Sequence, residues 1–116
     1  MYKLVILFEP IADWEAFESQ WPQFLHLVEE MPGLRREATS RVAHFLYGQP
    51  EYARMHELYF DDLESAEAAM ASDQGREAGS LLQSMSAGRL NLFLAEHKED
   101  ELENIRKYKR GDDESD

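Results

Sequence analysis

The sequence contains no cysteine and few basic residues. Without cysteine, disulfide bonds and thiolate metal sites are excluded, although this does not fix the redox compartment. Only 12 lysines and arginines accompany 24 acidic residues, which gives a formal net charge of −12. A negative charge of this size argues against binding to nucleic-acid phosphates or to an anionic membrane surface. We therefore expect neither nucleic acid nor a membrane among the partners.

Long hydrophobic runs are also missing. The apolar run LVILF near the N-terminus is shorter than the apolar part of a signal peptide and far shorter than a membrane-spanning helix. The sequence has no glycine-rich nucleotide loop, nucleophile elbow, Cys-His pair or haem-attachment motif. We expect a cytoplasmic protein that carries no cofactor.

The chain of 116 residues, 43% of them hydrophobic, is long enough for one domain with a packed core. Residues 2–8 form a β-branched and aromatic run that is typical of a buried strand. Asp13 is placed to cap a helix, in which apolar residues recur every three or four positions until the turn at Pro32 and Gly33. Pro22 lacks a backbone donor, so we expect it to divide this helix into two pieces.

Three more strands are predicted, in residues 34–48, 52–60 and 89–96. Asp61 and Asp62 are placed to cap a second helical region, which we expect to break after Gly75. The resulting order β-α-β-β-α-β indicates an α+β, ferredoxin-like fold. In this fold a four-stranded antiparallel sheet carries both helical layers on one face.

The opposite face of the sheet is predicted to be apolar. If Leu58 and Phe60 pack against the helices, strand alternation turns their neighbours to the other side. Five residues are then expected on this open face: Met55, Glu57, Tyr59, Asn91 and Phe93. Such a face is too apolar to remain in water, and its simplest cover is the same face of a second subunit. We expect a homodimer.

Several stretches, in their order along the chain, resemble the EthD family of dimeric α+β barrel proteins. They are MPGLRR after the first helix, ELYFDDLESAEAAMAS from the third strand into the second helix, the SDQG that overlaps its end, and the leucine-rich closing strand. The resemblance covers residues 2–97. We assign residues 1–97 to this domain and residues 98–116 to a charged C-terminal extension, partly helical or disordered.

The resemblance implies a ferredoxin-like monomer whose open sheet face pairs with that of a partner and closes a barrel around a cavity. The family is named after a protein associated with bacterial degradation of an alkyl ether. Barrels of the same architecture include cofactor-independent monooxygenases, lactone isomerases and haem-dependent enzymes, and the fold does not choose among them. Family members commonly have His-x-Pro-Leu before the Pro-Gly turn. Here Phe24 replaces that histidine and His26 stands at the proline position.

Glu57, Tyr59 and His56 are the predicted catalytic residues. A carboxylate on an enclosed apolar face is suited to general acid or base catalysis, which favours Glu57; the alternative is a salt bridge with Lys3 or an arginine. His56 lies on the other face of its strand, and its alternative role is structural. No histidine spacing matches a compact metal signature. A haem or metal site assembled by the tertiary structure, through His56 or His26, is nevertheless a third hypothesis.

The residues predicted to bind a ligand are Arg41, Met55, Asn91, Phe93, Trp21 and His26. Arg41 shares one face of its strand with Arg35. If the smaller residues on the other face turn to the core, Arg41 faces the cavity, where it would contact an anionic or carbonyl-bearing ligand. The alternative is that these arginines protect a sheet edge and pair with nearby Glu29, Glu30 or Glu37. Trp21 is either a core residue or one wall of a ligand cleft.

These observations lead to one functional expectation and one alternative. We expect an EthD-like homodimer that binds a small apolar or aromatic molecule in the barrel cavity and carries out cofactor-independent oxidation or isomerisation in catabolism. The alternative is a non-catalytic homodimer, in which the barrel is only an interface and no small-molecule chemistry takes place.

Overall fold

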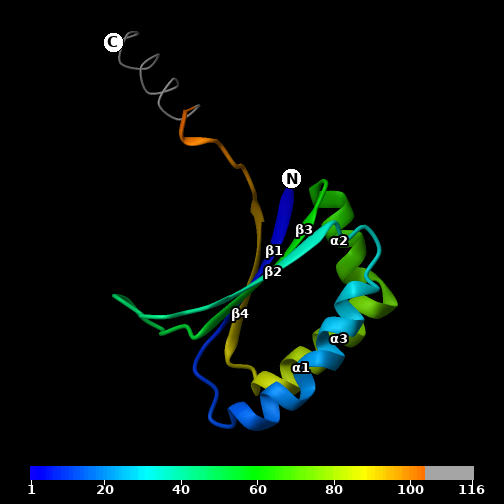
Figure 1. Cartoon of the computed structure of the whole chain (residues 1–116). Coiled ribbons are helices and arrows are strands. Elements are labelled where there is room, and N and C mark those ends of the chain that lie inside the picture. Colours follow the sequence, from blue (N-terminus) through cyan, green and yellow to red (C-terminus); the bar gives the residue numbers. More distant parts are fainter. Residues whose placement is uncertain (104–116) are drawn as a thin grey trace.

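The computed structural model describes residues 1–103 and shows one sheet with a layer of helices on one side (Figure 1). Its elements are β1 (Tyr2–Phe8), α1 (Trp14–Glu29), β2 (Arg36–Arg41), β3 (Arg54–Phe60), α2 (Leu63–Ala71), α3 (Asp73–Ser86) and β4 (Leu90–Glu96). The strands lie in the order β2-β3-β1-β4, and all neighbours are antiparallel. The predicted α+β, ferredoxin-like fold is confirmed. Most of the predicted C-terminal extension lies outside the described residues.

The core lies between the helices and one face of the sheet. Leu4, Ile6 and Phe8 of β1 are buried there against Phe17 and Phe24 of α1. The strand run predicted for residues 2–8 is confirmed at both ends. Within residues 1–103, no helix has the length and apolar character needed to cross a membrane.

Helix α1 is continuous through Pro22, so the prediction of two helical pieces is wrong. Proline removes one backbone hydrogen bond, but the aromatic side chains around it hold the helix to the sheet. The Trp21 ring lies 5.8 Å from the Phe8 ring of β1 and 5.2 Å from the His56 ring of β3, centroid to centroid. Tertiary packing of this kind outweighs local helix propensity. The predicted cap is confirmed, since the Asp13 side chain accepts a hydrogen bond from the first turn.

The second helical region breaks at Ser72, and not after Gly75 as predicted. Ser72 has an extended backbone, and its hydroxyl accepts a 3.0 Å hydrogen bond from the Gly75 backbone N–H, which caps α3. Gly75 itself lies in the first turn of α3. A Cβ atom there would come 2.2 Å from the Ala69 carbonyl oxygen, so the glycine permits close packing of α3 on α2. Asp62 caps α2 as predicted, accepting a 2.7 Å hydrogen bond from the Ser65 backbone.

The β2–β3 hairpin is shorter than predicted and has a long connection. Residues 42–53 form a loop that projects beyond the sheet (Figure 1). Its base is fixed by hydrogen bonds from the Ala53 backbone N–H to the Phe8 carbonyl at 2.7 Å and from the Val42 N–H to the Ala53 carbonyl at 2.9 Å. Leu46 and Tyr47, which the sequence places in a strand, are 90% and 95% exposed.

Strand alternation is confirmed for β1, β3 and β4 but is inverted for β2. Thr39 pairs with His56, and Ala38 pairs with Glu57, so the larger polar residues of β2 face the helices and the smaller ones face outward. The prediction that Arg41 faces the barrel side is therefore wrong. The prediction assumed that the smaller residues of β2 face the core. At this end of the sheet, however, β3 presents the polar side chains of Arg54 and His56 to the helix layer, and these side chains require polar partners on β2.

Candidate functional site

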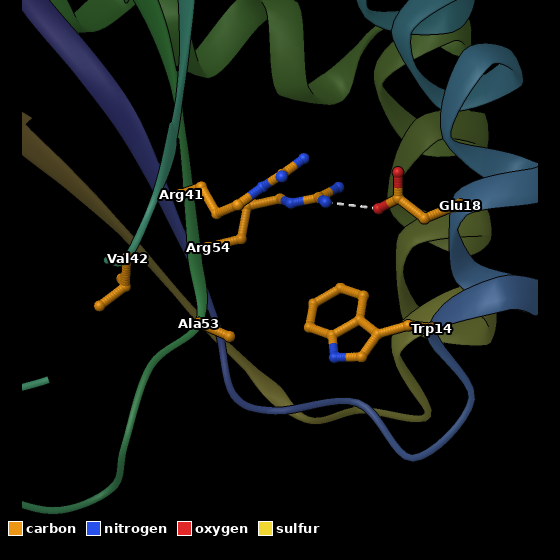
Figure 2. A pocket seen from close by; sticks show the side chains of 6 residues that line it. All are labelled: Trp14, Glu18, Arg41, Val42, Ala53 and Arg54. Carbon is orange, nitrogen blue, oxygen red and sulfur yellow. Dashed lines mark ion pairs between the residues drawn. The ribbon is translucent and has the colours of Figure 1, made fainter. Parts of the chain in front are cut away.

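A polar pocket lies between the N-terminal half of α1 and the end of the sheet formed by β2 and β3 (Figure 2). It consists of two adjoining hollows of about 430 and 380 Å³, which share Glu18, Arg41 and Arg54. We call it the arginine pocket. Its lining residues are Trp14, Glu18, Trp21, Thr39, Arg41, Val42, Ala53 and Arg54.

Arg54 is the buried cation of the pocket. Its residue surface is only 7% exposed, and its guanidinium carbon lies 5.2 Å from the Trp14 ring centroid and 4.9 Å from that of Trp21. Glu18 forms an ion pair with this guanidinium (Figure 2). Aromatic faces and a carboxylate together hold Arg54 in a fixed orientation, with its charge directed toward α1.

Arg41 supplies a second positive charge. It lies directly opposite Arg54 in the β2–β3 register, and both side chains extend from the sheet toward α1 (Figure 2). Like charges at opposing positions destabilise a sheet unless a counter-charge is near. Among residues 1–103, no carboxylate lies within 4.0 Å of the Arg41 guanidinium. The pocket therefore carries more positive than negative charge.

A line of hydrogen-bonded side chains runs from the pocket into the core. The Thr39 hydroxyl lies 2.7 Å from His56 Nδ1, and His56 Nε2 lies 3.0 Å from a carboxylate oxygen of Glu37. Thr39 lines the pocket, whereas His56 is fully buried with the Trp21 ring 5.2 Å away. We call these three residues the threonine–histidine–glutamate line. They join an open hollow to a buried imidazole.

The environment of His56 keeps the imidazole neutral. Burial lowers the pKa of His56 below its ordinary value, and the positive charge of Arg54 acts in the same direction. The hydrogen bond and the negative charge of Glu37, together with the charge of Glu57, oppose this shift. The net result is a neutral imidazole that can accept one further proton, beside a carboxylate that would stabilise the imidazolium.

Glu57 and Tyr59 lie on the open face, away from the arginine pocket. Glu57 forms an ion pair with Lys3, which is the alternative stated for it above, and it accepts a 3.3 Å hydrogen bond from the Tyr59 hydroxyl. The Arg36 guanidinium stacks 4.1 Å from the Tyr59 ring centroid. Both residues are already buried in the single chain, at 8% and 5% exposed, and the catalytic roles proposed for them stay predictions.

The other predicted ligand residues are divided between the two faces. Met55, Asn91 and Phe93 share the open face with Glu57, and the Asn91 amide donates a 2.7 Å hydrogen bond to the Tyr52 hydroxyl. Trp21 lines the arginine pocket. His26 does not, because its side chain is 71% exposed on the outer side of α1 and pairs with Glu30. The structure thus gives His26 no place in this pocket.

The two arginines that follow the first turn do not pair with Glu29 or Glu30. Arg35 pairs with Asp61 at 3.3 Å, and Arg36 pairs with Glu99 at 2.9 Å. The pairing of an arginine with Glu29 or Glu30 expected from the sequence is therefore wrong. The hairpin register brings Arg35 beside the end of β3, which is why its partner comes from there.

Seven residues of the pocket and of the line behind it were not predicted from the sequence: Trp14, Glu18, Glu37, Thr39, Val42, Ala53 and Arg54. A usable signal existed in β3, where Arg54 and His56 alternate onto the face that also carries Leu58. A charged and a titratable residue on a helix-facing side require polar partners from a neighbouring strand or helix. Among residues 1–103, no cluster of His, Asp or Glu side chains has the arrangement of a metal site.

No model of a known protein family matches the sequence. A curated protein of Rhodococcus erythropolis, an uncharacterised 11.0 kDa protein of the thcB-thcC intergenic region, is 23% identical over 99 residues, which span 84% of this chain and 96% of that protein. The crystal structure of an ethyl tert-butyl ether D (EthD) family protein of Bacillus halodurans is 30% identical, with a TM-score of 0.77. The match covers 84% of this chain and 99% of that one.

More distant crystal structures share the fold. A dimeric ferredoxin-like protein of unknown function from Jannaschia is 17% identical with a TM-score of 0.64, over 83% of this chain and 98% of that one. SnoaB of Streptomyces nogalater, a cofactor-independent oxygenase, is 15% identical with a TM-score of 0.65, over 85% of this chain and 94% of that one. At these identities the likeness establishes the architecture alone.

Proposed function

Because this chain belongs to the EthD family and has its ferredoxin-like α+β fold, we propose that it is a homodimer that binds a small organic anion or carbonyl compound in the arginine pocket. The pocket is formed within one subunit, by α1 and the β2–β3 end of the sheet. The proposal moves the ligand from the barrel side of the sheet, where the sequence placed it, to the helix side.

The paired arginines carry this proposal. Arg41 and Arg54 occupy opposing positions on adjacent strands, and Glu18 is the only carboxylate among the described residues that line the pocket. An anionic or carbonyl oxygen between the two guanidiniums would relieve their repulsion and accept hydrogen bonds from both. The Trp14 and Trp21 rings beside them provide apolar surface for an aromatic or alicyclic body.

Such a pocket suits chemistry in which negative charge develops on an oxygen atom. Removal of a proton from carbon next to a carbonyl group produces an enolate, and fixed positive charge at that oxygen stabilises it. Return of the proton to a different carbon completes an isomerisation. Reaction of the same enolate with dioxygen is the cofactor-independent oxidation that the sequence suggested. SnoaB, a cofactor-independent oxygenase of the same fold, supports this chemical class as a proposal.

The dimer is proposed from the open face. Four apolar residues of this face lie next to one another in the strand register: Val5, Leu7, Met55 and Phe93. Phe93 is 45% exposed in the single chain. A second copy of the same face is the simplest cover. The dimeric description of the Jannaschia protein supports this assembly.

A pair of matched charge-removing variants tests the ligand site. Isothermal titration with 2-naphthoate, and with the neutral 2-naphthamide for comparison, measures binding to the wild-type protein. We expect Arg41→Gln to weaken 2-naphthoate binding about 10- to 100-fold, because a hydrogen bond to a charged group contributes about 1.5–3 kcal/mol. Arg35→Gln is the control, since it removes the same charge from an arginine that pairs with Asp61 outside the pocket.

The control defines the outcome that would contradict the proposal. Arg35→Gln should leave the affinity for 2-naphthoate within about twofold of wild type, because exposed charges outside the site are screened by salt. Equal losses in the two variants would show a nonspecific charge effect. Absence of measurable binding of either compound by the wild-type dimer would favour the non-catalytic alternative, in which the fold serves association only.

A further inference from the structure

The threonine–histidine–glutamate line has the order of a proton relay. Thr39 is the member that reaches the arginine pocket, His56 lies behind it, and Glu37 lies behind His56. A hydroxyl, an imidazole and a carboxylate joined in this order form the arrangement by which a buried base draws a proton through a hydroxyl group. Here all three come from neighbouring positions on β2 and β3.

The chemistry of the partners fixes the direction of the line. The Glu37 carboxylate only accepts hydrogen bonds, so His56 Nε2 carries the proton that it shares with Glu37. His56 Nδ1 is then unprotonated and accepts from the Thr39 hydroxyl. Thr39 therefore presents its oxygen lone pairs, and not its proton, to the pocket.

We propose that Thr39, His56 and Glu37 form the general-base relay of the arginine pocket, acting on an enolisable carbonyl compound with an acidic C–H bond. This inference rests on the proposed ligand site, whose arginines hold the carbonyl oxygen. Neither the family likeness nor the predicted catalytic set contains Thr39 or Glu37.

The proton transfer balances without an added reagent. The C–H bond of the ligand breaks, its electron pair forms the enolate, and its proton passes to the Thr39 oxygen as the Thr39 proton passes to His56 Nδ1. His56 becomes an imidazolium, and its Nε2–H remains bonded to Glu37. The reverse sequence returns a proton to the enolate, at the same carbon or at a conjugated one. Arg41 and Arg54 face the oxygen that gains charge.

Glu18 is the competing base, because its carboxylate also lines the pocket. Its carboxylate is, however, engaged in an ion pair with the Arg54 guanidinium. Glu18 also lies on α1, across the pocket from the line that ends in Thr39. Variants at the two positions therefore separate the two routes.

The test follows exchange of the C1 hydrogens of 2-tetralone for deuterium in D₂O by NMR, with the full-length protein. We expect Thr39→Val to lower the protein-catalysed exchange rate about 100-fold or more, and Glu37→Gln to lower it as well, since general-base catalysis contributes about 10²–10⁴. Thr39→Ser restores the hydroxyl and should stay within about tenfold of wild type. Thr39→Val is nearly isosteric on an exposed, β-favouring strand position, so it should fold.

Binding of 2-naphthoate, measured on the same variants, separates the relay from the ligand site. Thr39→Val keeps both arginines, so its loss of exchange should be far larger than any loss of 2-naphthoate affinity. Three outcomes would each overturn the relay. Thr39→Val could retain the exchange rate of the wild type, or Glu18→Gln could abolish exchange instead. The third outcome is a wild-type protein that binds 2-naphthoate without accelerating exchange. Failure of the wild type to bind 2-naphthoate would overturn the ligand site itself.

Discussion

Phe93 offers a quantitative test of the proposed dimer. It lies on the open face of β4, and 45% of its surface is exposed in the single chain. Full burial of a phenylalanine side chain contributes about 1.5–3 kcal/mol, so covering this share contributes about 0.7–1.4 kcal/mol in each subunit. A two-fold interface contains Phe93 twice, which gives about 1.4–2.7 kcal/mol for the dimer. We therefore expect Phe93→Ala to raise the dimer dissociation constant about 10- to 100-fold.

Sedimentation equilibrium over a dilution series measures this constant. Leu63→Ala is the matched control, because Leu63 is 40% exposed but lies at the start of α2, in the helix layer and away from the open face. Thermal melting followed by circular dichroism confirms that both variants fold. An unchanged constant for Phe93→Ala, or an equal loss for Leu63→Ala, would refute the assignment of the open face as the interface.

Three further outcomes follow from the structure. Glu18→Gln should tighten 2-naphthoate binding about three- to fivefold, because it removes an internal anion that competes for Arg54; weaker binding in titration would contradict this. Gly79→Ala should stabilise the protein by about 0.5–1 kcal/mol in urea denaturation, since the added Cβ meets nothing within 4 Å. Gly75→Ala should destabilise the protein, because its Cβ would come 2.2 Å from the Ala69 carbonyl oxygen. Equal effects of the two variants would refute the close packing of α3 on α2 at Gly75. Burial lowers the pKa of His56, so the unfolded chain takes up a proton at higher pH than the folded one. The free energy of unfolding should therefore fall as the pH drops below about 6.5, and it should level off below the pKa of the folded state. A constant free energy of unfolding from about pH 7.5 to 5.5 would count against a buried neutral imidazole.

The elements with strong local signals were predictable from the sequence. The apolar run of β1 could pack only as a buried strand, and the aspartates before α1 and α2 cap their helices as expected. The continuity of α1 was not predictable, because it depends on the packing of Trp21 against Phe8 of β1 and His56 of β3, which no local rule at Pro22 contains. The break at Ser72 was missed because Gly75 was taken as a helix breaker, although its role is close contact with Ala69.

The candidate site was less predictable than the fold. Its position depends on the face of β2, and alternation within a strand fixes the two sets of side chains without saying which set turns inward. The size of the residues favoured the wrong set. The register with β3 decides the matter, since Thr39 opposite His56 and Arg41 opposite Arg54 form one polar face. Information of this kind lies in the pairing of two strands that are separated by the loop at 42–53.

The distribution of polarity over the sheet links the two proposals. In a monomer with one sheet and one helix layer, the helix-facing side is expected to be apolar and the outer side polar. Here two features depart from that arrangement: Arg54 and His56 of β3 are buried under α1, while Phe93 of β4 is 45% exposed on the outer face. Burying a cation and an imidazole under a helix has a free-energy cost, which a structural role alone does not explain. An outer face with apolar side chains has a cost of its own in water. A ligand site on the helix side and a subunit contact on the outer side each account for one of these two costs.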